Sequence, residues 1–246
     1  MRTFVVFLAC LALITVYSFT DPFVMSNISP TKKRVKPFEA WLYEEVNIAF
    51  GLTRLPTLPI LDEWQKASYP TDDTHRETIE AYRQTLLEYV DAWNEDELKY
   101  MFVSPFVRLV DFVSPNYKVF TQRPLTVTYE NGALTTTGRV EFMLAEGIQI
   151  PRRPYFFLHE YKQENRRSND PLGQLLIAMI AAQAANADEK PIYGCFVSGR
   201  SWFFVVLQAK TYAVSNAYNA ASDDIFRIFA MLLEMKRIID GSYKHL

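Results

Sequence analysis

The spacing of apolar residues predicts helices in the first half of the chain. Four apolar residues recur at helical spacing, and Gly51 directly after them predicts a C-cap: Phe38, Leu42, Val46 and Phe50. A short helical segment is expected after Pro59, and a long helix from about Thr74 to Trp93. The stretch from residue 36 to about residue 112 is therefore predicted to be helical.

A further helix is predicted to begin at Asn94. Glu97 stands three residues after this asparagine, which is the spacing of a capping box. Pro105 lies further along the same segment and is expected to kink it.

Strands are predicted from about residue 117 onward. Two segments rich in β-branched and aromatic residues, 119–129 and 133–144, flank Asn131-Gly132, a strong hairpin signal. A third strand, PYFFLHEYK, precedes a helix with Asp170 as N-cap and Pro171 at its first position. Two more strands, IYGCFVS and WFFVVLQ, and a closing amphipathic helix follow. This order predicts an α/β or α+β fold with a mixed central sheet flanked by helices.

Composition excludes a few classes of protein. The chain has 246 residues, of which 49% are hydrophobic, enough for a substantial core. A formal net charge of −2 favours no particular partner. Two cysteines and three scattered histidines form neither a disulfide framework nor a zinc-ligand pattern.

The N-terminal stretch from residue 3 to residue 20 is uncharged and mostly apolar. It fits a secretory signal, a membrane anchor, or an extension that is not part of the mature protein. Met25 opens a polar stretch typical of the start of a soluble protein, and we take it as the expected start. This interpretation predicts a cytoplasmic protein; the alternative is a protein anchored in the membrane through residues 3–20.

Charged residues at the end of the third predicted strand suggest a catalytic site. Glu160 and Lys162 share one face of that strand, which alone is typical of an exposed strand end with a salt bridge. The preceding strand, however, holds Glu141 between Val140 and Phe142, where an unpaired carboxylate is costly to bury. If the strands are neighbours, the two carboxylates converge and suit Mg²⁺. A nearby lysine would then stabilise developing negative charge, as phosphodiester hydrolysis requires.

These segments together resemble the PD-(D/E)XK nuclease superfamily. The resemblance rests on Gly138-Arg139-Val140-Glu141, on Glu160-Tyr161-Lys162 and on Gln174 in the following helix, and it extends through residues 191–207. It covers roughly residues 94–240. The segment KPFEAWLYEEVNIAFGL is similar to the N-terminal helices of bacterial members. The resemblance implies a restriction-endonuclease-like core with an N-terminal helical extension.

The resemblance also assigns roles by position. It implies that Glu141 is the main metal ligand, that Glu160 is the second, and that the carbonyl of Tyr161 is a third. Lys162 would orient or activate the attacking water, and Gln174 would hold the site or a phosphate. The implied activity is hydrolysis of DNA with Mg²⁺ or Mn²⁺ as the cofactor.

Glu97 has two interpretations: a capping-box residue, or the first acidic residue of the family pattern. Four arginines flank the strand that carries Glu160, and we expect them to contact the DNA backbone: Arg152, Arg153, Arg166 and Arg167. The family usually has aspartate at the position of Glu141. This difference favours the alternative function, a catalytically inactive member that binds nucleic acid or protein.

The expected organisation has three parts: an apolar leader (1–24), an N-terminal helical region packed on the core (25–93), and the nuclease-like core (94–246). DNA is the expected partner, and a homodimer is the expected assembly to test. A membrane is a partner only if the leader is retained.

Overall fold

The computed structural model describes residues 34–129, 134–162, 170–188 and 190–242. All of them belong to one compact unit, Lys33–Leu246. The leader 1–24, including the stretch 3–20, lies outside the described residues. So does the Asn131-Gly132 turn.

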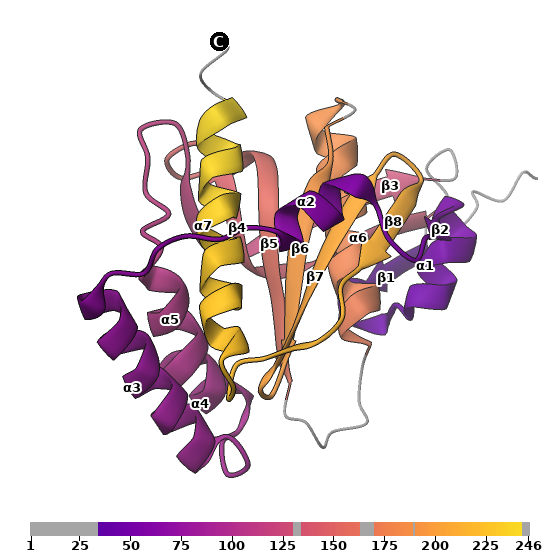
Figure 1. Cartoon of the computed structure of the whole chain (residues 1–246). Helices are drawn as coiled ribbons and strands as arrows, with labels where there is room; N and C mark the ends of the chain where they lie inside the picture. The colour runs from indigo at the N-terminus through magenta and orange to yellow at the C-terminus, as the bar shows by residue number, and fades with distance from the viewer. Residues whose placement is uncertain (1–33, 130–133, 163–169, 189, 243–246) are drawn as a thin grey trace, which may run out of the picture. The chain divides into compact units, whose positions relative to one another are not determined.

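The described residues form one mixed nine-stranded sheet with helices on both faces, as the sequence predicts (Figure 1). One side of it is an antiparallel meander of β3 (Lys118–Tyr129), β4 (Leu134–Glu146) and β5 (Arg152–Lys162). The helix α6 (Pro171–Asn186) then crosses to β6 (Ile192–Ser198), which is parallel to β5. β7 (Ser201–Gln208) and β8 (Thr211–Val214) continue the sheet, and β9 (Tyr218–Asn219) pairs with β7.

The N-terminal region contributes strands as well as helices, which corrects the prediction that the stretch from residue 36 to about residue 112 is helical. β1 (Arg34–Pro37) pairs with β4, and β2 (Thr53–Arg54) pairs with β8. The predicted helix from Phe38 is split into a 3-10 turn, η1 (Phe38–Ala40), and α1 (Tyr43–Phe50), because Leu42 between them is extended. The predicted C-cap is confirmed: Gly51 has a φ of 63°.

The other helices follow the predicted order. α2 (Pro59–Gln65) and α3 (Asp73–Tyr89) precede a continuous helical stretch of α4 (Glu95–Leu98), η2 (Lys99–Val103) and α5 (Ser104–Arg108). The capping box at Asn94 is confirmed. The expected effect of Pro105 takes the form of a π turn, η2, directly before it. α7 (Asp224–Ser242) closes the described chain.

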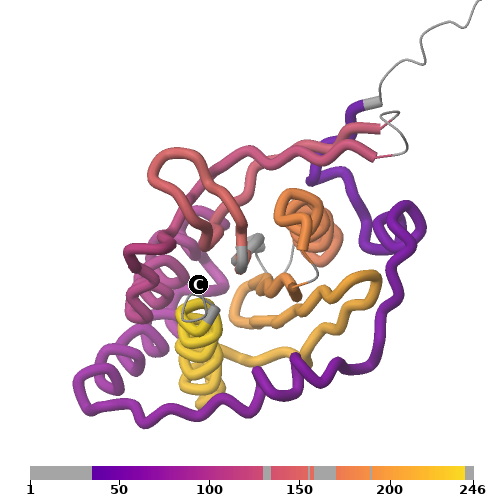
Figure 2. Tube along the Cα trace, turned by 90° about the horizontal axis from the view of Figure 1, so that it is seen from above, coloured from indigo at the N-terminus to yellow at the C-terminus, as the bar shows by residue number. Residues whose placement is uncertain are grey.

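The sheet curves around α6, and the segment from β1 through α1 to β2 closes the remaining side (Figure 2). Every residue of α6 from Leu172 to Ala182 is buried, which is typical of a helix enclosed on all sides. Its Asp170 N-cap, which accepts from the backbone N of Gly173, and Pro171 at the first position are confirmed. Gly173 allows a close approach: a Cβ there would lie 2.4 Å from the carbonyl oxygen of Trp41.

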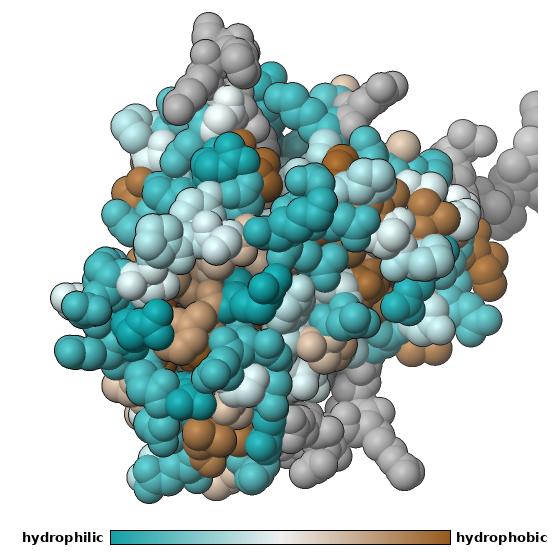
Figure 3. Space-filling model, in the orientation of Figure 1, coloured by the Kyte–Doolittle hydropathy of each residue, from teal (hydrophilic) through white to brown (hydrophobic). Residues whose placement is uncertain are grey.

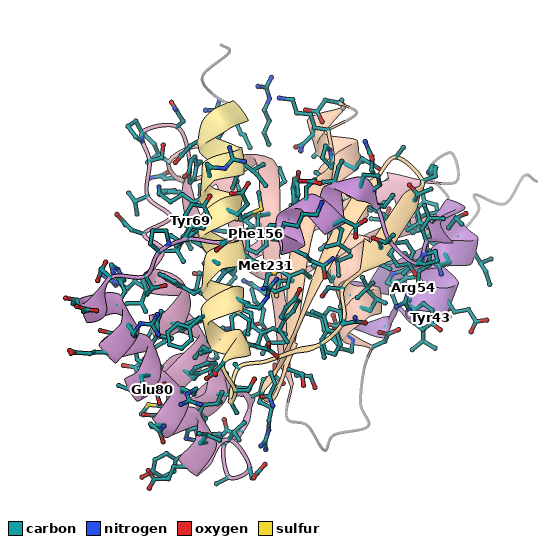
Figure 4. The ribbon with its side chains drawn as sticks, in the orientation of Figure 1. Tyr43, Arg54, Tyr69, Glu80, Phe156 and Met231 are labelled. Atoms are coloured by element: carbon teal, nitrogen blue, oxygen red, sulfur yellow. The ribbon has the colours of Figure 1, made fainter. Side chains whose placement is uncertain are left out.

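The opposite face of the sheet is covered by α7 and by the helices from α2 to α5 (Figure 1). Phe156 of β5 and Met231 of α7, both labelled in Figure 4, belong to the apolar cluster between them. Trp64 of α2 donates its indole N–H to the carbonyl of Met231 at 2.7 Å. Alternate strand residues therefore face two separate apolar clusters, one under α7 and one around α6.

No helix in the described ranges is long and apolar enough to span a bilayer. Exposed apolar side chains are present nonetheless: Leu42 and Ile48 of α1 are 53% and 79% exposed. They belong to the part of the molecule at the right of Figure 3, where brown side chains reach the surface.

Candidate functional site

Glu141 lies at a bend shared by β3 and β4. Thr121 pairs with Phe142 and Arg123 pairs with Val140, whereas the intervening Gln122 and Glu141 form no pair. Gln122 has a φ of 53°, an uncommon value for a residue other than glycine. Arg139 donates to the Gln122 carbonyl at 3.1 Å. One residue is unpaired on each strand, so the register of β3 against β4 is the same on both sides of this interruption.

The Glu141 carboxylate accepts a hydrogen bond and an ion pair from Lys99. The distance from Lys99 Nζ to Glu141 Oε2 is 2.8 Å, and the two side chains are 25% and 19% exposed. Lys99 opens the π turn η2, in which the backbone N of Ser104 donates to the Lys99 carbonyl. Single π turns within helices are frequent at functional sites. The helix before the meander thus delivers a cation, not an acid, to Glu141.

Glu97 has a different partner. Its carboxylate accepts from the backbone N of Asn94 at 2.7 Å, and its own N–H donates to the Asn94 side chain at 2.9 Å. The side chain is exposed at the helix start. The capping-box interpretation of Glu97 is confirmed, and its family role stays a prediction.

Glu160 and Lys162 lie on β5, beyond the last registered pair of β5 with β4. The last registered pair before the bend is Phe142 with Leu158, so Glu141 and Glu160 follow one and two residues beyond it. The register of β5 against β6 shifts between His159 and Tyr161, which places Glu160 in a bulge. The backbone of Glu160, Tyr161 and Lys162 is described, but their side chains lie outside the described part of the structure.

Gln174 lies in the first turn of α6, next along the chain after β5. The residue is only 7% exposed, and its Nε2 has no hydrogen-bond partner among the described residues. A buried amide donor without a partner costs about 1–3 kcal/mol, so such groups are rare and call for an explanation. The Asp170 carboxylate joins the start of α6 to the start of α1. It accepts from the backbone N of Gly173 and, at 2.6 Å, from the backbone N of Tyr43.

The arginines do not all lie beside this site. Arg152 and Arg153 begin β5, whereas Glu160 is near its other end, so Arg153 and Glu160 are about 23 Å apart at ~3.3 Å per residue. Arg153 forms an ion pair with Glu146 instead, with 3.8 Å between Nη1 and Oε1. This distance excludes contact with a phosphate held at Glu160, and only contact with a more remote phosphate stays a prediction. Arg166 and Arg167 lie outside the described residues.

The donor atoms at this end of the sheet are oxygens, which suit a hard cation such as Mg²⁺. Glu141 supplies a carboxylate, and the backbone of β5 places Glu160 and the carbonyl of Tyr161 on the adjacent strand. Within the described residues no three His, Cys, Asp or Glu side chains group together. Mg²⁺ commonly takes only one or two carboxylates and several waters, so the residues present fit the ion if Lys99 leaves an oxygen of Glu141 free.

No protein-family model matches the chain, and no curated protein matches it. The resemblance to the PD-(D/E)XK superfamily therefore stays a prediction from the sequence. The sequence singled out Glu141 and Gln174, whose roles in a site stay predictions, and it did not indicate Lys99 as the partner of Glu141. The sequence does mark the position of Lys99, which lies between the capping box and Pro105. In the structure a π turn begins at this position.

Proposed function

We propose that the protein hydrolyses phosphodiester bonds of DNA with a PD-(D/E)XK-type site that uses Mg²⁺ or Mn²⁺. One observation carries the proposal. Glu141 and the Glu160-Tyr161-Lys162 segment both lie beyond the last registered pair of two adjacent strands, and the first turn of the next helix holds Gln174, whose buried amide has no partner among the described residues. The same order of helix, three-strand meander, crossover helix and parallel strand supports the resemblance drawn from the sequence.

Each residue has a role in this proposal. The carboxylates of Glu141 and Glu160 and the carbonyl of Tyr161 hold the metal ion, which polarises the scissile phosphate when bound. Lys162 orients the attacking water and stabilises the negative charge that develops on the phosphate. Gln174 donates its free Nε2–H to a phosphate oxygen or to a ligand of the site, which would explain why it is buried without a partner.

A second candidate function is a catalytically inactive module with the same fold that binds nucleic acid or protein. The observation in its favour is the 2.8 Å ion pair of Lys99 with Glu141, because an ammonium at that distance competes with a metal ion for the carboxylate. Titration of Mn²⁺ into the full chain and into Lys99→Met separates the two candidates. The nuclease proposal expects binding by both proteins, with higher affinity in the variant; the inactive module expects none.

The activity test is cleavage of supercoiled plasmid and of branched DNA by the full chain, with Mg²⁺, with Mn²⁺ and with EDTA. We expect cleavage in either metal and none in EDTA. Glu160→Gln and Lys162→Ala should each lower the rate at least a hundredfold, in the range that removal of one catalytic charge costs. Glu146→Gln is the matched control, since Glu146 is a partly buried carboxylate at the far end of β4.

An active control with inactive site variants supports the proposal. Cleavage that survives in the Glu160→Gln/Lys162→Ala double variant would show that another site or a contaminant cuts the DNA. Absence of both metal binding and cleavage in the parent protein would contradict the nuclease proposal and favour the catalytically inactive module.

We place this function in the cytoplasm, where DNA is accessible to a bacterial nuclease, and we take a homodimer as the assembly to test. Cell fractionation with mass spectrometry of the N-terminus checks the first point. Recovery of the full-length chain in the membrane pellet would contradict it. Light scattering of the purified protein checks the second.

A further inference from the structure

A pocket of about 380 Å³ lies between the end of α5 and the strands β3 and β4. This volume is within the roughly 300–1,000 Å³ range of small-molecule sites. Its floor is apolar, and three of the floor residues are almost fully buried: Val107, Phe112 and Phe142. The two phenylalanine rings meet edge to face, with centroids 6.3 Å apart. A flat aromatic ligand fits such a floor better than a sugar or a phosphate does.

Polar side chains line the rim of the pocket beside the exposed Val113. Ser104, Arg108, Asp111 and Thr121 line it and are exposed. None of these four side chains has a hydrogen-bond or ion-pair partner among the described residues. A guanidinium and a carboxylate that face one pocket without pairing to each other are suited to a ligand that offers both acceptors and donors.

Asp111 is held in an uncommon backbone conformation with a φ of 50°. Two backbone hydrogen bonds fix it there: its N–H donates to the Arg108 carbonyl at 3.1 Å, and its carbonyl accepts from Val113 at 2.8 Å. Residues other than glycine in this region of φ cluster at ligand-binding sites. The chain therefore orders Asp111 at the pocket rim at some cost in conformational free energy.

The pocket adjoins the candidate site. Phe142 follows Glu141 directly on β4, and Thr121 is the cross-strand partner of Phe142. On the helical side, the backbone N of Ser104 donates to the carbonyl of Lys99, which pairs with Glu141. A polymer with a phosphate at Glu141 therefore has its neighbouring units within reach of the pocket.

We propose that this pocket binds one unpaired nucleobase, guanine in preference, of the DNA strand at Glu141; the inference rests on the nuclease function proposed above. Guanine presents two acceptors, O6 and N7, to a guanidinium and an amino group to a carboxylate, so it uses both Arg108 and Asp111. The apolar floor accepts the ring faces, as aromatic side chains do with unstacked bases. A base within a duplex cannot enter, so the pocket selects an extruded or single-stranded nucleotide.

The test is DNA binding without catalysis. Fluorescence anisotropy in EDTA compares the full chain with labelled duplexes that carry one bulged nucleotide: G, A, C, T or an abasic site. We expect the G bulge to bind about tenfold more tightly than the abasic bulge, as one specific base contact allows. Asp111→Asn should reduce this ratio below about twofold without changing abasic binding, and asparagine tolerates the left-handed backbone conformation. Arg108→Gln should also weaken the preference.

Arg123→Gln is the control for Arg108→Gln, because Arg123 is exposed on β3 and lies over the ring of Phe120, outside the pocket. It should lower the affinity for all five duplexes equally and preserve the ratio. Equal affinity of the parent protein for all five duplexes would overturn the pocket proposal and leave the nuclease proposal intact. No binding to any duplex, with no cleavage in Mg²⁺ or Mn²⁺, would overturn both.

Discussion

Lys99 Nζ and Glu141 Oε2 lie 2.8 Å apart, although 42 positions separate the two residues in the sequence. Both side chains are at least three-quarters buried, at 25% and 19% exposure. Removing one partner leaves the other charge poorly solvated. We expect Lys99→Met to lower the free energy of unfolding by about 1–3 kcal/mol, measured by urea denaturation.

Lys66→Met is the control for this change, because both partners of its salt bridge with Glu63 are exposed (69% and 72%), and solvent screening should make its effect on stability much smaller. The double variant Lys99→Met/Glu141→Leu should then be more stable than the sum of the two single changes predicts, with a coupling of about 0.5–3 kcal/mol. Additive single changes would show that the ion pair contributes nothing.

Gln174 gives a prediction in which stability and function change in opposite directions. Its Nε2 is buried without a partner in the described part of the chain, so Gln174→Met, which keeps the side-chain length, removes a donor that those residues leave unsatisfied. We expect the variant to be more stable by about 1–2 kcal/mol and to lose most DNA cleavage. Thermal unfolding measures the first effect and the plasmid assay the second. A more stable variant with full activity would assign Gln174 to the core alone.

Gly173 tests how tightly α6 packs against the N-terminal segment. A Cβ there would lie 2.4 Å from the Trp41 carbonyl oxygen and 2.8 Å from the Tyr43 backbone N. These neighbours are backbone atoms and cannot rotate away, so Gly173→Ala should destabilise the protein by about 2–4 kcal/mol. Gly241→Ala is the control: it is also helical, has open space around it, and should be neutral or stabilising by up to about 1 kcal/mol. Equal unfolding midpoints for the two variants would contradict this packing.

Local signals in the sequence predicted the elements that depend on local chemistry. The caps at Gly51, Asn94 and Asp170 are confirmed because each needs only a few neighbouring residues. The meander, α6 and the two strands after it are confirmed for the same reason, since hydrophobic periodicity marks them.

The elements that depend on distant partners were missed. β1 and β2 have four and two residues, too few for any periodicity, and they exist because β4 and β8 offer them an edge. The apolar spacing from Phe38 is genuine, but Phe38 packs against Gly138 and Trp41 donates its indole N–H to Thr136 at 2.8 Å. These contacts, a hundred residues away, interrupt the helix that the spacing predicts.

The candidate site shows the same division. Glu141 is recognisable because a carboxylate in an apolar strand needs a partner, but the sequence does not say which one. Lys99 reaches it only through the packing of η2 against the bend in β4. The pocket beside it is equally invisible in the sequence, because its rim combines the end of α5 with a residue of β3.

Glu234 of α7 carries a prediction of pH dependence. The Arg237 guanidinium donates to both of its oxygens at 2.8 and 3.0 Å, and the Tyr69 hydroxyl donates as well; Tyr69 lies beside α7 in Figure 4. The hydrogen bonds from Arg237 and then from Tyr69 hold the pKa of Glu234 below its ordinary value of 4.5, against the opposing effect of burial. A carboxyl with a lowered pKa in the folded state stabilises the fold above its unfolded pKa.

This contribution is therefore complete above about pH 4.5 and disappears as the pH falls through the lower folded pKa. Glu234→Gln should lower the free energy of unfolding by about 1–2 kcal/mol at pH 7, and the difference from the parent should shrink steadily below pH 4.5. Tyr69→Phe removes one donor and should show a smaller difference over the same pH range. Urea titrations between pH 3 and pH 7 measure both. A Glu234→Gln difference that stays constant down to pH 3 would contradict a pKa of Glu234 lowered by Arg237 and Tyr69.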